Sequence, residues 1–319
     1  YFNGIGIASI RAGLKQLGFA DAEETAIGAT FVKREYERIS REGVQSVVIT
    51  SCCPTVNTLI EKYYPEITEC LAPVMTPMQA HCTDIKRRHS DAKTVFIGPC
   101  LSKKDEAARV GVDAALTFEE IAAMFEKKGI VLESMRDHDE KSRARLFPTS
   151  GGVLNTMTYK NPLYDYYTID GLDNVIPALE DIRRGGIEHC FIEMSACAGS
   201  CVRGPIMRRK HPSSVRDYQA VSSYAGKEDF NVEQPEVSQL TNEYRPAFLH
   251  KVKPSHTELM EILRKMGKVS PADELNCGTC GYNTCRDKAE AIYQGKAEIN
   301  MCLPYLMEKS ERFADNILD

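Results

Sequence analysis

The 319-residue sequence contains no tryptophan, no long apolar run and no large excess of charge of one sign. A transmembrane helix needs ~18 or more consecutive apolar residues, so we expect no membrane span. The 40 basic and 45 acidic residues leave a net charge of −5, which argues against a nucleic-acid-binding surface. We also find no internal repeat of about 20–50 residues.

Cysteine, in contrast, is abundant, with twelve residues in the chain. Nine of them fall in tight groups or at the ends of predicted strands. Disulfide-rich secreted proteins are normally much shorter, and no signal peptide is recognisable in residues 1–319. We therefore expect a reduced, cytoplasmic metalloprotein.

The first cysteine group follows three apolar, β-branched runs. Residues 44–49 lead to Cys52 and Cys53, residues 94–97 lead to Cys100, and residues 187–192 lead to Cys197 and Cys201. Open α/β sheets bind ligands at the carboxyl ends of their strands, so these five thiols are predicted to share one crevice. A metal centre or redox site is the favoured interpretation, and small buried hydrophobic side chains are the alternative.

The second group lies near the C-terminus and consists of Cys277, Cys280, Cys285 and Cys302. Three thiols fall within nine residues, and the fourth follows a predicted helix over residues 286–300. A cubane iron–sulfur cluster needs four thiolates around a compact core. Structural zinc sites tend to use two separated pairs, so [4Fe–4S] is favoured and zinc is the alternative.

Predicted strands and helices alternate, which indicates an α/β fold with mostly parallel sheet. We expect helices over residues 5–19, 30–42, 56–64, 117–128, 179–184 and 255–267, a strand over 130–133, and irregular structure over 211–244. The turn at 147–154 leads into a helix whose start suits an anion; a plain tight turn is the alternative.

The predicted architecture has two lobes, each with a small, mostly parallel sheet flanked by helices, and the cluster lies in the cleft between them. A small, mainly helical iron–sulfur domain follows. The expected domains are residues 1–248 and 249–319, and we expect part of the first domain to precede Tyr1.

Three motifs resemble those of the catalytic, H-cluster-binding domain of [FeFe]-hydrogenases. They are Thr50-Ser51-Cys52-Cys53-Pro54, Pro99-Cys100-Leu101-Ser102-Lys103-Lys104-Asp105-Glu106 and Glu193-Met194-Ser195-Ala196-Cys197-Ala198-Gly199-Ser200-Cys201. The turn Ser150-Gly151-Gly152-Val153 is also similar to that of the family, and Ser150 and Gly151 are predicted to contact the cofactor. The resemblance covers residues 1–205. The tail resembles a small iron–sulfur domain that some divergent members carry.

The resemblance implies a role for each matching position. Cys53, Cys100, Cys197 and Cys201 would hold a [4Fe–4S] cubane, and Cys201 would also bridge to a diiron subcluster carrying CO, cyanide and a dithiolate. Cys52 would pass protons, Lys103 would hydrogen-bond a cyanide, and Glu106 would support the lysine. Cys277, Cys280, Cys285 and Cys302 would hold a second [4Fe–4S] cluster. The implied reaction is reversible splitting of H2 into protons and electrons.

Several positions depart from the prototypical enzymes. Val56 replaces a tryptophan, and Gly98 and Ser195 replace methionines beside the diiron site, which predicts a more open pocket. Ala72 replaces a serine of the usual proton route, and two nearby glutamates, Glu35 and Glu37, are the candidates for continuing it. The run that follows the last cysteine, residues 202–205, has also lost its glycine-rich character. These changes predict slow turnover and a sensory or regulatory branch.

Three functional interpretations follow. The first is a divergent [FeFe]-hydrogenase of an anaerobe, acting as a catalyst or as an H2 sensor. The second is an iron–sulfur scaffold or assembly protein with cubanes but no diiron site, and the third is a zinc-bearing interaction module. The expected partners of the first are H2 and protons, a ferredoxin-like carrier or further iron–sulfur domains, and the diiron maturation machinery; a homodimer is left open. Cys70, Cys82 and Cys190 are interpreted as structural.

Overall fold

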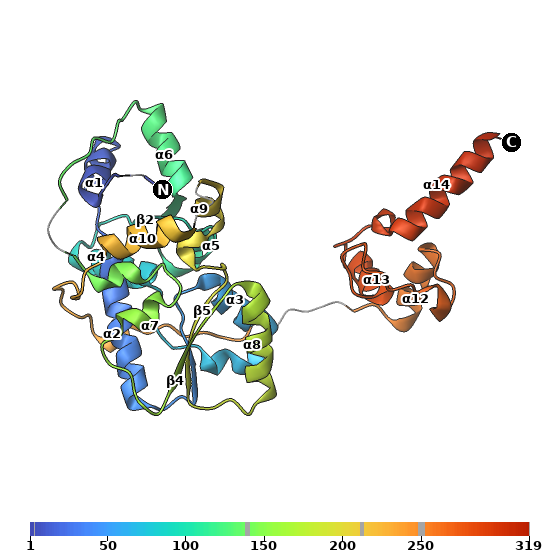
Figure 1. Ribbon diagram of the computed structural model, residues 1–319, viewed down its shortest axis with the longest axis horizontal. Helices are drawn as coiled ribbons and strands as arrows, with labels where there is room; N and C mark the ends of the chain where they lie inside the picture. The colour runs from blue at the N-terminus through green and yellow to red at the C-terminus, as the bar shows by residue number, and fades with distance from the viewer. Residues whose placement is uncertain (3, 138–140, 211–213, 248–252, 319) are drawn as a thin grey trace. The chain divides into compact units, whose positions relative to one another are not determined.

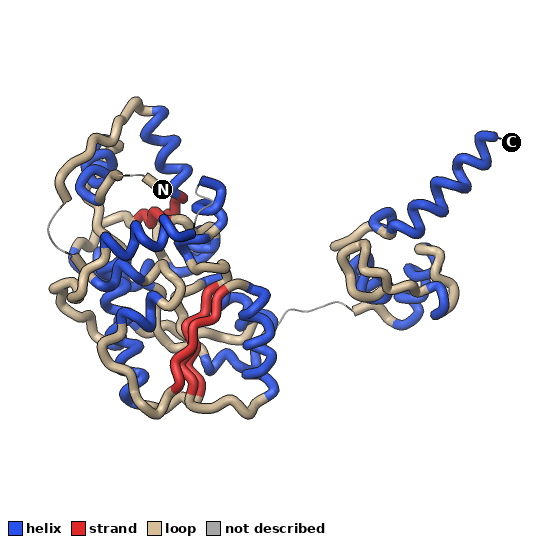
Figure 2. The backbone as a smooth tube through the Cα atoms, viewed as in Figure 1, coloured by secondary structure: helices blue, strands red, loops and turns tan. Residues whose placement is uncertain are grey.

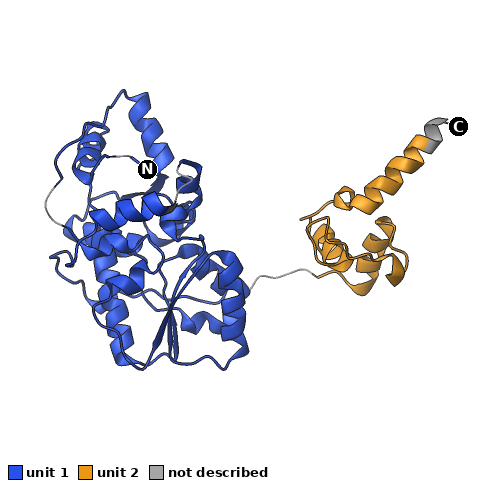
Figure 3. Ribbon diagram, in the orientation of Figure 1, with its two compact units in different colours: residues 1–248 blue, residues 249–319 orange. Residues whose placement is uncertain are grey.

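The computed structural model describes residues 1–2, 4–137, 141–210, 214–247 and 253–318. The chain divides into two compact units, Tyr1–Phe248 and Leu249–Asp319 (Figure 3). The first unit combines helices with strands, whereas the second is built from helices and loops (Figure 2). Within the described ranges, no helix is both long enough and apolar enough to cross a membrane.

The larger sheet of the first unit has three parallel strands in the order β1-β5-β4 (Figure 1). Their bounds are β1 Val47–Ile49, β4 Asp165–Asp170 and β5 Cys190–Ser195. Ile49 is paired with Ile192. Because successive side chains of a strand point to opposite faces, Val48 and Phe191 join one buried cluster, and Ile49 and Ile192 join another. Apolar side chains on both faces are typical of parallel strands that helices cover on both sides.

Four helices cover these two faces. They are α2 Ala26–Glu42, α3 Pro54–Tyr63, α7 Gly152–Thr156 and α8 Leu172–Arg184. Tyr36 of α2 and Val153 of α7 pack in the cluster that contains Phe191. Ile60 of α3 and Leu179 of α8 pack in the cluster on the opposite face. Burying a large apolar side chain contributes ~1.5–3 kcal/mol, so this layered core fixes the strand ends from which the cysteine loops leave.

The smaller sheet pairs β2 (Val95–Gly98) with β3 (Ala114–Thr117) in parallel. Phe96 faces a cluster with α4 (Pro77–Arg88) and α5 (Ser102–Val110), and Ile97 faces one with α1 (Ile7–Gln16) and α6 (Phe118–Lys127). The predicted capping box at the start of α6 is confirmed, with the Thr117 hydroxyl accepting from the Glu120 backbone N–H. The predicted α/β class with small parallel sheets is therefore confirmed.

Two strand predictions need correction. Residues 130–133 form no strand; Ile130 and Leu132 instead pack as loop side chains against the cluster of α1 and α6. The strands β3 and β4 were not predicted. β4 is an edge strand in which half of the residues are exposed, so it lacks an apolar run. The third cysteine strand also lies later than expected, at Cys190–Ser195 rather than at residues 187–192.

The helix predicted at 179–184 is only the end of α8, which begins at Leu172. Pro177 lies inside this helix and would ordinarily argue against one, but the buried residues Val175 and Leu179 keep the spacing of an amphipathic helix. The segment predicted as irregular contains α10 (Ser214–Tyr224) and α11 (Val237–Leu240), while residues 211–213 of that segment lie outside the described residues. A short helix, α9 Pro205–Lys210, precedes it.

The second unit contains α12 (His256–Lys265), α13 (Cys285–Tyr293) and α14 (Leu303–Leu318). The predicted capping box is confirmed, since Ser255 accepts from the backbone N–H of Glu258. The predicted helix over 286–300 is shorter, and a 3-10 turn at Ile299–Met301 precedes the last cysteine. Its small core combines apolar side chains with two of the cysteines; the members are Leu263, Met266, Cys285, Ala289 and Cys302.

Candidate metal centre

The loops that carry Cys52, Cys53 and Cys197 leave the same edge of the larger sheet. β1 ends at Ile49 and β5 ends at Ser195, and the two strands are parallel neighbours. Their carboxyl ends therefore lie side by side, which brings the two cysteine loops together. Pro54 then begins α3, a position where proline is favoured because its missing N–H costs no helical hydrogen bond.

Four thiols of the first group lie close enough together for the charge of one to act on the pKa of another. The pKa of Cys197 is raised to about 11, first by burial and then by the charges of Cys53 and Cys100. The same causes, in the same order, raise the pKa of Cys201 well above the ordinary thiol value. Cys201 is exposed at the surface, yet enough protein surrounds its thiol to disfavour the thiolate. The four predicted ligands of the cubane are therefore brought together.

The surroundings of these thiols suit thiolates bound to an iron–sulfur cluster better than free thiolates. Burial raises the pKa of Cys53, and the backbone N–H groups of Ala196 and Val56 partly offset this by donating toward its sulfur. Several thiolates in one desolvated place repel each other, and bound iron would supply the positive charge that stabilises them. In the described part of the chain, no three His, Cys, Asp or Glu side chains converge tightly enough to hold a single metal ion. A cubane is larger than an ion and needs wider spacing.

Cys52 is in a different environment from its neighbour. Its Sγ lies 3.2 Å from the hydroxyl of Tyr36, and either group can donate. Burial raises the pKa of Cys52 to about 12, although the Tyr36 hydrogen bond and the Lys103 charge act in the opposite direction. At neutral pH, Cys52 holds its proton.

Tyr36 is the residue that the sequence interpretation missed. The buried Tyr36 hydroxyl accepts from the backbone N–H of Ser51 at 2.9 Å, and the Ser51 hydroxyl donates to the carbonyl of Val74 at 2.7 Å. We had considered its neighbours, Glu35 and Glu37, as continuations of the proton route. The structure directs the phenol between them toward Cys52.

The two glutamates take part in other contacts. Glu35 accepts from the guanidinium of Arg38 at 2.8 Å, and Glu37 accepts from the hydroxyl of Thr158 at 2.8 Å. One helical turn before Glu37, the buried Lys33 lies 3.4 Å from its carboxylate. Adjacent residues of an α-helix point about 100° apart, so the side chain of Tyr36 leaves α2 in a different direction from that of Glu37. The glutamate contacts thus hold α2 in place and leave Tyr36 for the cysteine loop.

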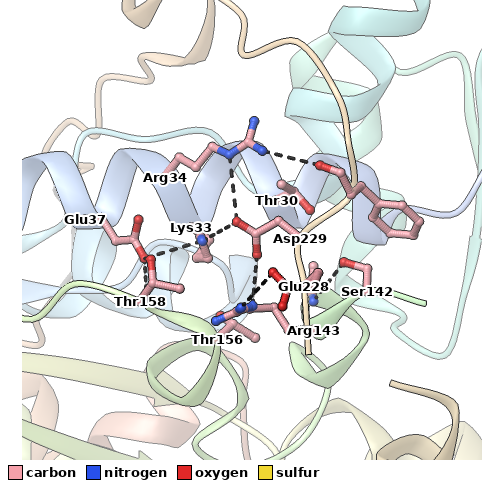
Figure 4. A network of polar contacts seen from close by, with 12 residues as sticks. Thr30, Lys33, Arg34, Glu37, Ser142, Arg143, Thr156, Thr158, Glu228 and Asp229 are labelled. Atoms are coloured by element: carbon pink, nitrogen blue, oxygen red, sulfur yellow. Dashed lines mark hydrogen bonds and ion pairs between the residues drawn. The ribbon is translucent and has the colours of Figure 1, made fainter. Parts of the chain in front are cut away.

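Figure 4 shows the polar network that anchors α2. The side chain of Lys33 is 1% exposed, and its Nζ lies 2.5 Å from the carboxylate of Asp229. The other oxygen of Asp229 lies 3.2 Å from Nε of Arg143. A buried cation without such partners would carry a large desolvation cost. The network therefore joins three distant segments around the helix that positions Tyr36.

Lys103 and Glu106 form a buried ion pair on α5. Nζ of Lys103 lies 2.6 Å from one carboxylate oxygen of Glu106, and the Thr76 hydroxyl donates to the other oxygen at 2.5 Å. The charge of Lys103 favours the thiolate forms of Cys52 and Cys53, which places the ammonium near both. The predicted contact between Lys103 and Glu106 is present, and their roles toward a cofactor stay predictions.

The turn at Ser150 and Gly151 is occupied by a side chain of the protein itself. Gly151 has φ +73°, and a Cβ on Gly152 would lie only 1.9 Å from the Leu146 carbonyl oxygen. The N–H of Leu154 donates to the carboxyl group of Glu193 at 2.9 Å. The anion that we expected this turn to suit is therefore an internal carboxylate. The hydroxyl of Ser150 donates to Asp170.

Glu193 is itself perturbed. It is 4% exposed, and burial raises its pKa to about 7, against the opposing effect of the backbone N–H groups of Leu154, Val153 and Gly151. Its charge disfavours the Cys52 thiolate, which shows that the two groups interact. The sequence motif contained Glu193, but only the fold shows that the carboxyl group lies inside the protein.

The structure also shows the surroundings of three positions that depart from the prototypical enzymes. A Cβ on Gly98 would lie 2.6 Å from the ring of Phe96. The aromatic ring of the same strand thus fills space that a side chain at Gly98 would take. Ala72 and Val56 are fully buried. Of the other cysteines, Cys82 and Cys190 are buried and Cys70 is partly buried against an apolar cluster, in keeping with structural roles.

In the second unit, Cys277, Cys280, Cys285 and Cys302 line one small hollow. Cys285 and Cys302 are buried, whereas Cys277 is exposed. A hydrogen bond with the Thr279 hydroxyl, 3.2 Å away, lowers the pKa of Cys277. The backbone N–H of Cys285 donates to the side chain of Asn276 at 2.8 Å, which holds the loop against the start of α13. The fold therefore gathers all four predicted ligands.

Comparison with known proteins agrees with both sites. Residues 5–205, more than half of the chain, match the family model described as the iron-only hydrogenase large subunit, C-terminal domain. The chain belongs to the iron-only hydrogenase family. A second family model, described as a putative Fe–S cluster, matches residues 273–304. The predicted family is confirmed, and iron–sulfur clusters are supported in both units.

Curated relatives of this hydrogenase-family chain have different names. It is 30% identical to the periplasmic [Fe] hydrogenase large subunit of Nitratidesulfovibrio vulgaris, over 61% of the chain and 62% of the relative. It is 28% identical to iron hydrogenase 1 of Clostridium pasteurianum, over 61% of the chain and 44% of the relative. It is also 26% identical to the cytosolic Fe–S cluster assembly factor NAR1 of Encephalitozoon cuniculi, over 57% of the chain and 59% of the relative. The chain thus spans less than two thirds of each.

Solved structures bear out the hydrogenase fold. An [FeFe]-hydrogenase structure concerned with oxygen inactivation superposes with a TM-score of 0.59 at 16% identity, over 77% of this chain and 90% of that one. A variant of the [FeFe]-hydrogenase HydA1 from Chlamydomonas reinhardtii gives a TM-score of 0.58 at 17% identity, over 77% and 89%. At these identities the likeness concerns the fold alone.

Proposed function

We propose that the chain is a divergent [FeFe]-hydrogenase domain that reversibly splits H2, slowly, as a catalyst or as an H2 sensor. The observation that carries this proposal is that Cys52 and Lys103 lie together with the four cubane cysteines. A cubane alone needs neither a protonated thiol nor a buried ammonium. Kinship with iron hydrogenases supports an oxidoreductase of this kind.

In this proposal, Cys53, Cys100, Cys197 and Cys201 would hold a [4Fe–4S] cubane, and Cys201 would also hold the diiron subcluster. The H-cluster, when bound, supplies the redox-active iron at which H2 becomes two protons and two electrons. Lys103 would present an ammonium for a cyanide ligand, and Glu106 orients that ammonium from 2.6 Å away.

The proposed work of Cys52 is to hold a proton at its Sγ beside the diiron site. Its raised pKa keeps the sulfur protonated at neutral pH, which makes it a donor that reverts to the thiol after each transfer. The Tyr36 hydroxyl can exchange this proton, because it lies 3.2 Å from the sulfur. A phenol gives up its proton reluctantly when buried, which agrees with slow turnover.

The second unit is proposed to bind a further [4Fe–4S] cluster and to pass electrons to a ferredoxin-like carrier or to further iron–sulfur domains. The four cysteines around one hollow and the match to the Fe–S cluster family support it. A cytoplasmic location in an anaerobe and dependence on diiron maturation machinery belong to the same proposal.

The second candidate function is an iron–sulfur scaffold or assembly protein. It is favoured by the similarity to a curated assembly factor and by the loss of the proton-route serine, replaced by the fully buried Ala72. Such a protein would keep the cubanes and lack the diiron subcluster. The two candidate functions therefore differ in whether the protein binds a diiron subcluster, which an experiment can observe.

The experiment is to load the anaerobic protein with the synthetic diiron cofactor and record infrared spectra of the CO and CN stretching region. H2 oxidation is assayed with a dye acceptor on the same sample. Protein-bound bands with H2 uptake above a Cys201→Ser control, which lacks the bridging thiolate, are expected of a hydrogenase. Brown protein that contains two cubanes and gives no bands after loading would instead support the scaffold.

A further inference from the structure

A lysine that no prediction included lies among the four cysteines of the second unit. Lys288 is on α13, one helical turn after Cys285, so the two side chains leave the same face of the helix. Its residue is 0% exposed, and it lines the same hollow as all four thiols. Within the described residues, Nζ of Lys288 is buried and has no hydrogen-bond partner.

An unpaired ammonium is expensive to bury. Lysine is almost never fully buried without a partner, and an isolated ammonium in a desolvated site is strongly destabilising. Among the described residues, no acidic side chain lines the hollow to offset this charge. The hollow is also lined by Lys268, which is 8% exposed. The charge of Lys268 acts on Cys277 by lowering its pKa, after the larger effect of Thr279. The site thus collects positive charge next to four thiols.

The group that would neutralise this charge is an anion inside the hollow. Four thiolates outweigh the positive charge of a cubane iron–sulfur core, so the assembled cluster is anionic. Its sulfides and thiolates also accept hydrogen bonds. Net charge and hydrogen bonds to sulfur are two of the factors that set the reduction potential of such clusters.

We propose that Lys288 is the internal counter-ion of the C-terminal cluster and raises its reduction potential. The ammonium donates to a cluster sulfur and stabilises the extra negative charge that one added electron brings. This inference rests on the proposed [4Fe–4S] cluster of the second unit. With the lysine, the cluster would accept an electron more readily than the same site would without it.

The test is a potentiometric titration of the full reconstituted chain with dithionite as reductant, followed by electron paramagnetic resonance. The signal of the C-terminal cluster is identified as the one that disappears in Cys280→Ser. Lys288→Met keeps the length of the side chain and removes its charge; Lys288→Gln keeps a donor and removes the charge. Lys296→Met removes an equal charge from an exposed position of the same unit and serves as control.

Both Lys288 variants are expected to disfavour cluster reduction at least about tenfold, which for one electron is about 59 mV. Lys296→Met is expected to change the potential by much less. A loaded Lys288→Met protein with the wild-type potential would overturn the inference and leave the proposed cluster intact. A wild-type second unit without iron, or with zinc in its place, would overturn the proposed cluster and with it the inference.

A second readout needs no cluster. In the iron-free chain, Lys288→Met removes a buried charge that has no partner, so the thermal midpoint of the second unit should rise relative to wild type and to Lys296→Met. After loading, this advantage should shrink or reverse. A midpoint of the iron-free variant at or below that of wild type would show that the ammonium is already compensated, which contradicts the proposal.

Discussion

The carboxyl group of Glu193 offers the sharpest test of the first unit. Its pKa in the fold is about 7, above its ordinary value of 4.5, because of burial. The folded state therefore holds this proton more tightly than the unfolded chain does. The resulting stabilisation is complete below pH 4.5 and is lost as the pH rises through 7. One pKa unit corresponds to about 1.4 kcal/mol, so the whole effect is about 3 kcal/mol.

Glu193→Gln should abolish this dependence. The amide stays neutral at every pH, and its carbonyl oxygen can still accept from the N–H of Leu154. Relative to wild type, the variant should gain up to about 3 kcal/mol of unfolding free energy by pH 8 and almost nothing at pH 4.5. Circular dichroism during urea unfolding of the iron-free, reduced chain would measure the difference at each pH.

Glu188→Gln is the matched control, because Glu188 lies just before the same strand and is exposed. It should shift stability little and equally at all pH values. A difference between wild type and Glu193→Gln that is constant with pH would refute the raised pKa. A difference that grows toward acid pH would mean that the fold lowers the pKa of Glu193 instead of raising it, and would refute the burial argument as well.

Three further changes follow from the described contacts. Cys52→Ala should leave both cubanes assembled, by iron content and colour, and lower H2 turnover at least about a hundredfold, since the proposed proton carrier is gone; unchanged turnover would require another route. Tyr36→Phe should cost about 1–3 kcal/mol in urea unfolding, because the buried N–H of Ser51 loses its acceptor, and a neutral result would mean that water replaces the phenol. Lys33→Met should cost about 1–3 kcal/mol, because Asp229 and Glu37 lose a buried ammonium while Arg143 still lies beside Asp229, whereas a stabilised variant would show that the pair never offset its own desolvation.

The sequence was most informative where one short segment determines the outcome. The β-branched run before Cys52 predicted a buried strand, and the Thr117 and Ser255 capping boxes predicted helix starts that the structure contains. The edge strand β4 could not be predicted, because half of its residues are exposed and these lie on both faces, so the strand has neither an apolar run nor a clean alternation. The apolar residues at 130–133 satisfied a strand pattern, but Ile130 and Leu132 only pack partly buried against helices, and Val131 is exposed.

The candidate site divides in the same way. The cysteine motifs predicted which thiols converge, since parallel strands bring their carboxyl ends together. Tyr36 and Lys288 escaped prediction because a tyrosine or lysine in a helix usually faces solvent or core, and only the packing shows which polar atom is buried beside a thiol. The fate of Glu193 depends on a turn more than 30 residues earlier in the chain, a relation that no local pattern contains.

The parallel pairing of β1 with β5 also has a consequence for biosynthesis. Thr50 and Met194 lie 144 residues apart in the chain and meet through a 3.3 Å hydrogen bond. At ribosomal speeds of about 5–20 residues per second, the first cysteine loop waits roughly 7–30 s for its partner strand to be made. During that interval Cys52 and Cys53 belong to an unfinished sheet with long-range contacts still to form. The proposed cubane of the first unit could therefore be completed only after Cys201 has been made, long after Cys53 has left the ribosome.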